Sequence, residues 1–390
     1  MGRRIWVGAI VALLLVAAAG GGYVAYTHSE AYQISVARGR GDVWARLDAM
    51  GELFNRQDPG GTIPVFVELL SDEDSTIRGK AAEYLGFLGA KEAVTPLIAA
   101  LAKQGPLGRG PFIEALGTIG DPRAVAPLVA LLESADKDEA RAVAQALARL
   151  GPEVVPALVK RLADPKPALR AAAATGLGRY AVEGDPSTMK ETLAPAIAPL
   201  IPLLYDPVAD VRAAAADAMG NIRDPKFLTS LMLALGDPDE RVREIIARVI
   251  SYYGDAAIAL LPSAFQSTDE HVRLGAAEAL GAIAEIGSYD PGQAGASYVK
   301  AARALLDEAL SKRDLVAVAG AYGYYIRRGR PEAVPLLMAA LEAHGHRRMA
   351  NGLLNCGVQE LHDAAIAWAT AHGYTIETGT GPGEYKWGKQ

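Results

Sequence analysis

The sequence has little of the chemistry on which most enzymes and nucleic-acid-binding proteins depend. It contains one cysteine, Cys356, in 390 residues, which excludes an intrachain disulfide and a cysteine-rich zinc site. It also lacks an excess of positive charge, because the formal net charge is −6. Binding to the phosphate backbone of nucleic acids needs a basic face. We therefore expect no nucleic acid and no thiolate-bound metal among the ligands.

Familiar catalytic and nucleotide-binding motifs are missing as well. The sequence has no Gly-x-Ser-x-Gly elbow, phosphate-binding loop, dinucleotide-binding glycine motif or His-Glu-x-x-His helix. Acidic loops such as "SDEDST" (71–76) and "GDPDER" (236–241) lack the ligand spacing of a calcium loop, and helix capping explains their acids. Histidines cluster near the C-terminus, and we interpret them as surface residues: His344, His346, His362 and His372. The sequence thus predicts no enzyme, metal, cofactor or small-molecule substrate.

One long hydrophobic run lies at the N-terminus. After Arg3 and Arg4, residues 5–27 ("IWVGAIVALLLVAAAGGGYVAYT") are uncharged and long enough to cross a hydrocarbon core of ~30 Å as a helix. Two interpretations stay open, an uncleaved signal anchor or a signal peptide cleaved before Gly20. The two arginines favour an N-terminus inside the cell. We expect a single-pass inner-membrane protein with its bulk in the periplasm, or a secreted protein if the segment is cleaved.

The rest of the chain is dominated by a repeat. A Leu-Gly-x-apolar-(Gly) pattern recurs at intervals of 30, 31 or 42 residues, starting at Leu85, Leu116, Leu147, Leu177, Met219, Ile250, Leu280, Tyr322 and Leu353. The two long intervals indicate loop insertions near 181–193 and 285–298. Each unit has the pattern of two helices, and the first often carries a proline in its opening turn. Proline is tolerated there because the first N–H groups of a helix lack intrahelical partners.

The second helix of a unit is amphipathic. In residues 240–253 the apolar residues follow one helical face: Val242, Ile245, Ile246, Val249, Ile250 and Tyr253. A lone helix pair cannot bury such a stripe on both sides, whereas stacked pairs can. The sequence therefore predicts an all-α fold, an α-solenoid of about nine to ten helix pairs at residues 42–373. One transmembrane helix (1–27) and a linker (28–41) precede it, and a flexible tail (374–390) follows.

The repeat units resemble a known family. "DPVADVRAAAADAMGNI", "DPDERVREIIARVISYYG" and "STDEHVRLGAAEALGAI" look like bacterial HEAT repeats, also called phycobilisome-lyase HEAT-like repeats. In that family an Asp in the loop within a repeat and an Arg that opens the second helix form a ladder between neighbouring repeats. The resemblance implies this role for Asp72, Arg78, Asp164, Arg170, Asp206, Arg212, Asp237 and Arg243. Arg109 and Arg273 lack the acid six residues earlier, so we expect a weaker or interrupted ladder there.

Tyrosine and arginine gather towards the C-terminal half, above all in "AYGYYIRRGR" (321–330). These side chains often anchor protein interfaces. Tyr322 and Tyr325 occupy the Leu and Ile positions of the repeat, which predicts that they are core residues. The candidates for partner binding are Tyr252, Tyr324, Arg327, Arg328 and Arg330.

The leading hypothesis is a membrane-anchored scaffold without catalysis. It would bind a protein or peptide partner on the concave surface built by the second helices. Two alternatives remain open. The first is a lyase-like or enzyme-accessory protein, which the resemblance implies and the export segment disfavours. The second is a structural subunit of an envelope complex.

Overall fold

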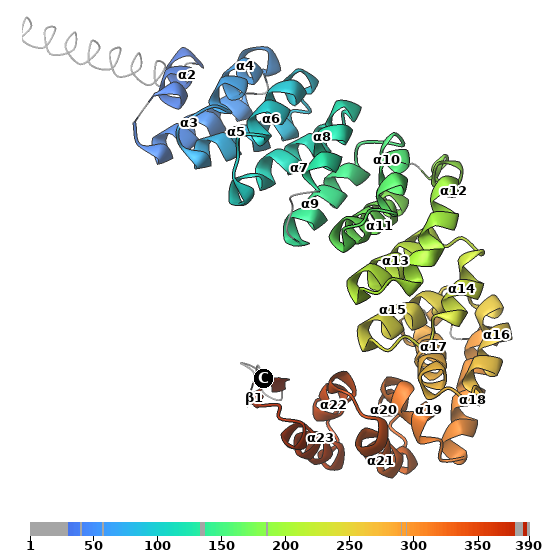
Figure 1. Ribbon diagram of the computed structural model, residues 1–390. Helices are drawn as coiled ribbons and strands as arrows, with labels where there is room; N and C mark the ends of the chain where they lie inside the picture. Colours follow the sequence, from blue (N-terminus) through green and yellow to red (C-terminus); the bar gives the residue numbers. More distant parts are fainter. Residues whose placement is uncertain are drawn as a thin grey trace, which may run out of the picture. The chain divides into compact units, whose positions relative to one another are not determined.

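The structure is a computed structural model that describes residues 30–39, 41–56, 58–132, 137–184, 186–289, 291–293, 295–378 and 385–387. Within these residues the chain is helical apart from one short two-stranded ribbon (Figure 1). The apolar segment at residues 1–27 lies outside the described residues, so its role as an anchor stays a prediction. No helix within the described residues has the length and apolarity needed to cross a membrane.

The helices follow one another as pairs, each with a first and a second helix. The first four pairs are α2 (Glu30–Arg38) with α3 (Val43–Asn55), α4 (Pro59–Leu69) with α5 (Ser75–Phe87), α6 (Val94–Leu101) with α7 (Gly110–Ile119), and α8 (Val125–Leu131) with α9 (Lys137–Ala148). The next four are α10 (Val154–Arg161) with α11 (Pro167–Glu183), α12 (Met189–Leu200) with α13 (Ala209–Ile222), α14 (Phe227–Leu233) with α15 (Glu240–Ser251), and α16 (Asp255–Phe265) with α17 (Glu270–Tyr289).

The array ends with two further pairs and an additional helix. In the ninth pair α18 (Ser297–Ser311) is followed by a second helix in two pieces, α19 (Leu315–Gly320) and α20 (Tyr322–Arg328). The tenth pair is α21 (Val334–His344) with α22 (Arg347–Leu354), and α23 (Gln359–Ala371) packs against α22. Short 3₁₀ helices join or precede several of these elements: η1 (Lys91–Ala93), η2 (Pro106–Gly108), η3 (Pro122–Ala124), η4 (Ile201–Tyr205), η5 (Pro291–Gln293) and η6 (Pro331–Ala333). The described residues thus contain ten helix pairs.

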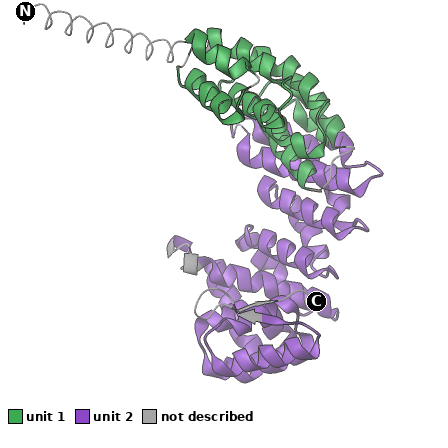
Figure 2. Ribbon diagram, turned by 90° about the vertical axis from the view of Figure 1, so that its left-hand side faces the viewer, with its two compact units in different colours: residues 1–158 green, residues 159–390 purple. Residues whose placement is uncertain are grey.

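The chain divides into two compact units, residues 1–158 and 159–390 (Figure 2). In each unit the Leu positions of the repeat motif are buried, except for Tyr322, which is half-buried and not the core residue that its position predicts. The motif glycines allow neighbouring second helices to pack closely. A Cβ atom on Gly117 would lie 2.7 Å from Cα of Ala146, and one on Gly178 would lie 2.8 Å from Cα of Ala218. These contacts leave no room for a side chain, which is the physical reason for glycine in the motif.

The first pair begins earlier than the sequence analysis predicts. The sequence predicts a linker at residues 28–41, and this prediction is wrong for residues 30–38, which form α2. Ala37 of this helix is fully buried, and Nε of Arg46 in α3 donates a hydrogen bond to its carbonyl oxygen at 3.0 Å. α2 is therefore the first helix of the first pair.

The two insertions are partly helical, although the sequence analysis expects loops. The residues near 181–193 continue α11 to Glu183 and begin α12 at Met189, and those near 285–298 continue α17 to Tyr289. A longer helix satisfies its own backbone hydrogen bonds, which a long loop cannot do.

The predicted flexible tail also contains regular structure. β1 (Ile376–Thr378) pairs antiparallel with β2 (Tyr385–Trp387), with Glu377 opposite Lys386.

Candidate binding site on the second-helix face

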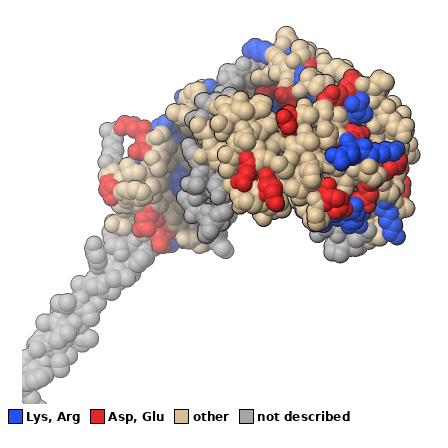
Figure 3. Space-filling view, turned by 90° about the horizontal axis from the view of Figure 1, so that it is seen from below, with Lys and Arg blue, Asp and Glu red and all other residues tan. Residues whose placement is uncertain are grey.

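Acidic and basic side chains are interspersed on the face of the protein seen in Figure 3, with no large basic patch in view. A search of the described residues finds no group of three or more His, Cys, Asp or Glu side chains placed to hold a metal ion. The polar features that stand out are a buried ladder of ion pairs and a cavity beside the point where this ladder is interrupted.

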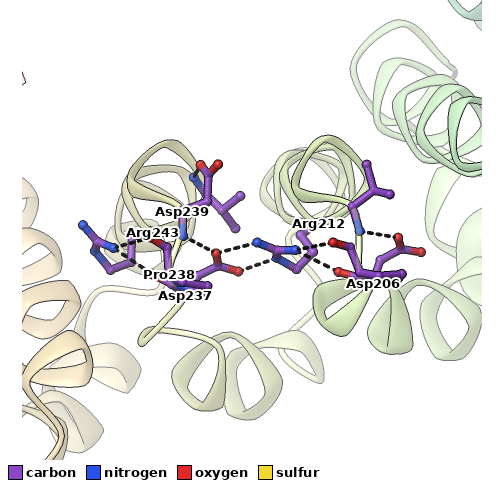
Figure 4. A network of polar contacts seen from close by, with 9 residues as sticks. Asp206, Arg212, Asp237, Pro238, Asp239 and Arg243 are labelled. Atoms are coloured by element: carbon purple, nitrogen blue, oxygen red, sulfur yellow. Dashed lines mark hydrogen bonds and ion pairs between the residues drawn. The ribbon is translucent and has the colours of Figure 1, made fainter.

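The ladder runs between neighbouring repeats (Figure 4). Arg212 in α13 donates from Nη1 to the backbone carbonyl of Asp206 at 2.9 Å, and from Nε and Nη2 to the carboxylate of Asp237 at 2.6 and 2.9 Å. Asp237 is 4% exposed in its side chain and also accepts from the Asp239 amide at 2.8 Å. Each arginine thus binds the backbone of the acid six residues earlier and the side chain of the acid in the next repeat.

The preceding rung has the same geometry. Arg170 donates to the carbonyl of Asp164 at 2.8 Å and to both carboxylate oxygens of Asp206 at 2.7 and 2.9 Å. Burial raises the pKa of Asp206, but hydrogen bonds from Arg170 and from the Val208 amide outweigh burial and hold that pKa below its ordinary value. The carboxylate therefore stays charged and paired at neutral pH.

In the N-terminal unit the ladder is less regular. Asp72 pairs with Arg46, a partner that the sequence analysis does not identify. Arg78 donates from Nη1 to the backbone carbonyl of Asp72 at 2.9 Å. Its Nε donates to Oε1 of Gln104 at 3.2 Å, so an amide takes the place of the acid in the next repeat. Arg109 instead reaches Glu139 at 3.3 Å.

The ladder is interrupted between α15 and α17. Ser267 occupies the position of the acid, because its carbonyl accepts from Arg273 at 2.9 Å and its hydroxyl accepts from the Asp269 amide at 3.1 Å. No carboxylate is then available there for Arg243. Its Nε lies 3.7 Å from Oε1 of Glu278, which is too long for a hydrogen bond.

Three buried polar atoms next to this interruption have no hydrogen-bond partner within the described structure. They are Nε of Arg243, Oε2 of Glu278 and Nε2 of His346. Buried polar atoms in native proteins are nearly always paired, so such a group needs an explanation. Burial raises the pKa of Glu278 to about 7, and the attraction of Arg243 is too weak to reverse this.

A cavity of about 290 Å³ lies beside these atoms, on the face formed by α15, α17, α20 and α22. Figure 1 shows these four helices following one another around a bend. Charged and aromatic side chains line the cavity: Glu240, Glu244, Arg248, Glu278, Glu285, Tyr322, Arg327, His346 and Arg348. Burial and the glutamates Glu240, Glu278 and Glu285 raise the pKa of Tyr322 to about 12. We call this space the inner cavity.

Ion pairs close the inner cavity between helix pairs that are not neighbours. Oε1 of Glu240 in α15 lies 2.5 Å from Nδ1 of His346 at the start of α22, and Glu244 pairs with Arg348. The second helices of this unit therefore bend far enough for the seventh pair to meet the tenth, and their face is concave here.

The structure places the five predicted partner-binding residues in different settings. Tyr252 is 42% exposed, with the guanidinium of Arg223 4.7 Å from its ring centre. Tyr324 is only 3% exposed and donates to Asp307 at 3.2 Å, so the expectation of an exposed anchor is wrong for this residue. Its burial follows from packing against the ring of Tyr325, 5.3 Å away.

The three predicted arginines also differ. Arg327 lines the inner cavity and pairs with Glu285 through Nε at 3.1 Å. Arg328 lies over the ring of Tyr324, and Arg330 donates to Asp307 at 3.1 Å. Of the five candidates, only Arg327 and Tyr324 line the inner cavity. Glu278, which sequence reasoning missed, lines it too, and so does His346, whose assignment to the surface is wrong because its side chain is only 16% exposed.

Comparisons with known proteins identify the repeats. A family model for HEAT repeats matches residues 34–110, 63–148 and 228–294, and a model for a HEAT-like repeat matches residues 167–222. Together the two models match more than half of the chain. No curated protein matches the sequence.

Solved structures with the same fold are distant in sequence. The Kap95:Nup1 complex has a TM-score of 0.50 at 14% identity, covering 86% of this chain and 56% of that chain. Kap95p with RanGDP gives a TM-score of 0.50 at 14% identity, with 88% and 52% covered. The chain thus spans about half the length of these proteins. The CpcE and CpcF complex of phycocyanin lyase from Nostoc sp. PCC7120 is 25% identical, with 63% and 94% covered and a TM-score of 0.33.

Proposed function

The chain belongs to the HEAT-repeat proteins, and we propose that it is a scaffold that binds a protein or peptide partner on the concave second-helix face of residues 159–390. The observation that carries this proposal is the inner cavity. It lies on that face, and it presents buried polar atoms that are unpaired within the described residues. A bound partner would supply the missing hydrogen bonds, and buried polar groups of this kind give a binding site its specificity.

The fold fits this role. Solenoid repeats build long surfaces on which each repeat contributes modestly to affinity, and a few well-packed pockets dominate the binding energy. The similar structures contain Kap95 in complex with Nup1 and with RanGDP, so an array of this fold can hold protein partners. At 14% identity the similarity supports a shared fold, and it does not identify the partner of this chain.

Residues 1–27 complete the proposal by tethering the scaffold to the inner membrane, with the repeats on the periplasmic side. This rests on the uncharged run of residues 5–27 and on Arg3 and Arg4 before it. A topology reporter fused after Gln390 tests the placement. We expect reporter activity on the periplasmic side, and activity restricted to the cytoplasm would contradict it.

Site-specific photocrosslinking in the native host tests the binding face. A photoreactive residue at position 282, which lines the inner cavity, is compared with one at Leu233, which is exposed on the first helix α14. We expect position 282, and not position 233, to capture a defined protein. Equal capture from both positions, or none from position 282, would refute the proposed face. Recovery of the captured protein at a fixed stoichiometry would favour a structural subunit of an envelope complex.

A further inference from the structure

We infer that the inner cavity recognises the guanidinium group of an arginine side chain in the partner, with the carboxylate of Glu278 as its main acceptor. This inference rests on the proposed function and names the chemical group that the binding face selects. It follows from three features of the cavity. These are an unpaired carboxylate oxygen, lining arginines that already have acidic partners, and an aromatic ring in the wall.

The unpaired atoms of the cavity lining include a carboxylate oxygen. Oε2 of Glu278 is buried without a partner in the described structure. Nε2 of His346 is a second buried atom of the lining without a partner in the described structure, while Nδ1 of the same ring lies 2.5 Å from Oε1 of Glu240. The Met349 amide also approaches Nδ1, but at 3.4 Å this contact is much weaker than the one to Glu240. A ligand that fits must therefore donate a hydrogen bond to Oε2 of Glu278.

The positive charges that line the cavity are already neutralised. Arg327 is held by Glu285, Arg348 by Glu244, and Arg248 by Asp217. Among the glutamates of the lining, Glu278 is the one without a close ion pair, because Arg243 remains 3.7 Å from its Oε1. A cation entering the cavity would thus meet one carboxylate whose charge is only weakly compensated, by Arg243 at 3.7 Å.

The shape of a guanidinium matches this arrangement better than that of an ammonium. It is planar, carries five N–H donors in a fixed fork and loses less hydration on burial than the ammonium of lysine. The ring of Tyr322 lies in the cavity wall near Glu240, Glu278 and Glu285. A cation held by these carboxylates can stack on the ring face, which adds a cation–π contact.

Peptide binding to the full chain in detergent micelles tests the inference. The probe is the peptide acetyl-Gly-Arg-Gly-amide, and its matched control contains citrulline, which has the same shape as arginine and no charge. Isothermal titration compares both peptides on the wild type, on Glu278→Gln, and on Glu332→Gln, whose glutamate is exposed outside the cavity. A third peptide with lysine in place of arginine tests whether the cavity requires the planar shape of a guanidinium.

We expect the arginine peptide to bind the wild type and Glu332→Gln equally, and to bind Glu278→Gln about tenfold more weakly or worse, because a charge-assisted hydrogen bond is lost. The citrulline peptide should bind the wild type about tenfold more weakly than the arginine peptide does, or worse. Equal binding of arginine and citrulline, equal binding of arginine and lysine, an unchanged Glu278→Gln affinity, or no saturable binding of the arginine peptide would overturn the inference. If position 282 still captures a partner in that case, the proposed function stands and only the guanidinium assignment falls.

Discussion

The buried carboxyl of Glu278 makes the stability of the C-terminal unit depend on pH. Burial raises its pKa from 4.5 to about 7 in the folded protein, whereas the unfolded chain keeps the ordinary value. Below pH 4.5 the group is neutral in both states and costs nothing. Between pH 4.5 and 7 the unfolded state loses its proton first, so folded stability falls as pH rises. The shift corresponds to about 3 kcal/mol at pH 8.

Glu278→Gln removes this dependence, because the amide stays neutral at every pH and has nearly the same shape. We expect the variant to match the wild type near pH 4.5 and to be about 3 kcal/mol more stable at pH 8. Hydrogen–deuterium exchange of the full chain in detergent micelles, read by mass spectrometry on peptides from α17, measures this locally. At pH 8 the α17 amides of the variant should exchange about a hundredfold more slowly than those of the wild type.

The comparison isolates one group, because all other titrating residues are shared by the two proteins. A difference in exchange that is equal at pH 5 and pH 8 would refute the reasoning, as would a wild type that is the more stable protein at pH 8. Either outcome would mean that Glu278 is ionised at little cost in the folded state. The argument that a weakly compensated carboxylate faces the inner cavity would then fail too.

Three further predictions concern the repeats. Asp237→Ala should lower the free energy of unfolding by about 3 kcal/mol, measured by urea denaturation of the full chain, because it removes the carboxylate that pairs with the buried guanidinium of Arg212. The control Arg241→Ala, at an exposed ion pair, should cost less than about 1 kcal/mol. Similar losses in the two variants would contradict the ladder's importance. Ser267→Asp should complete the interrupted rung and stabilise the protein by about 1 kcal/mol, a gain that should vanish in the Arg243→Ala background. Gly117→Ala should lower the melting temperature through a backbone clash that costs about 1–3 kcal/mol, and an unchanged value would show that the two helices can separate freely.

The fold could be predicted because the same pattern of apolar residues and glycine recurs in successive repeats. A Leu position that recurs every 30 or 31 residues must meet the same environment in each unit, and every Leu of the motif is buried in the structure. α2 escaped prediction because few of its residues are buried, so its docking depends on α3 and on the hydrogen bond from Arg46 to Ala37. A partner in another helix cannot be inferred from the local pattern of nine residues.

The site was predicted less well, for a similar reason. Tyrosine and arginine identify interface chemistry but not exposure, and Tyr324 is buried because of neighbours in its own helix pair. The inner cavity depends on Glu240 and His346, which approach each other only because three successive helix packings add up to a sharp bend. One signal was present in the sequence, since Ser267 stands six residues before Arg273, where other repeats carry an acid.

The contacts that close the inner cavity change how this part of the array should unfold. In a simple solenoid each repeat touches only its neighbours, so repeats can fray from the end one at a time. Here Glu270 in α17 also contacts His344, 74 residues away, and the pair of Glu240 and His346 spans a longer separation. Loss of the tenth pair, α21 with α22, would thus remove contacts from α15 and α17 at once. The last four helix pairs should therefore unfold as one cooperative unit and should not fray from the C-terminal end one pair at a time.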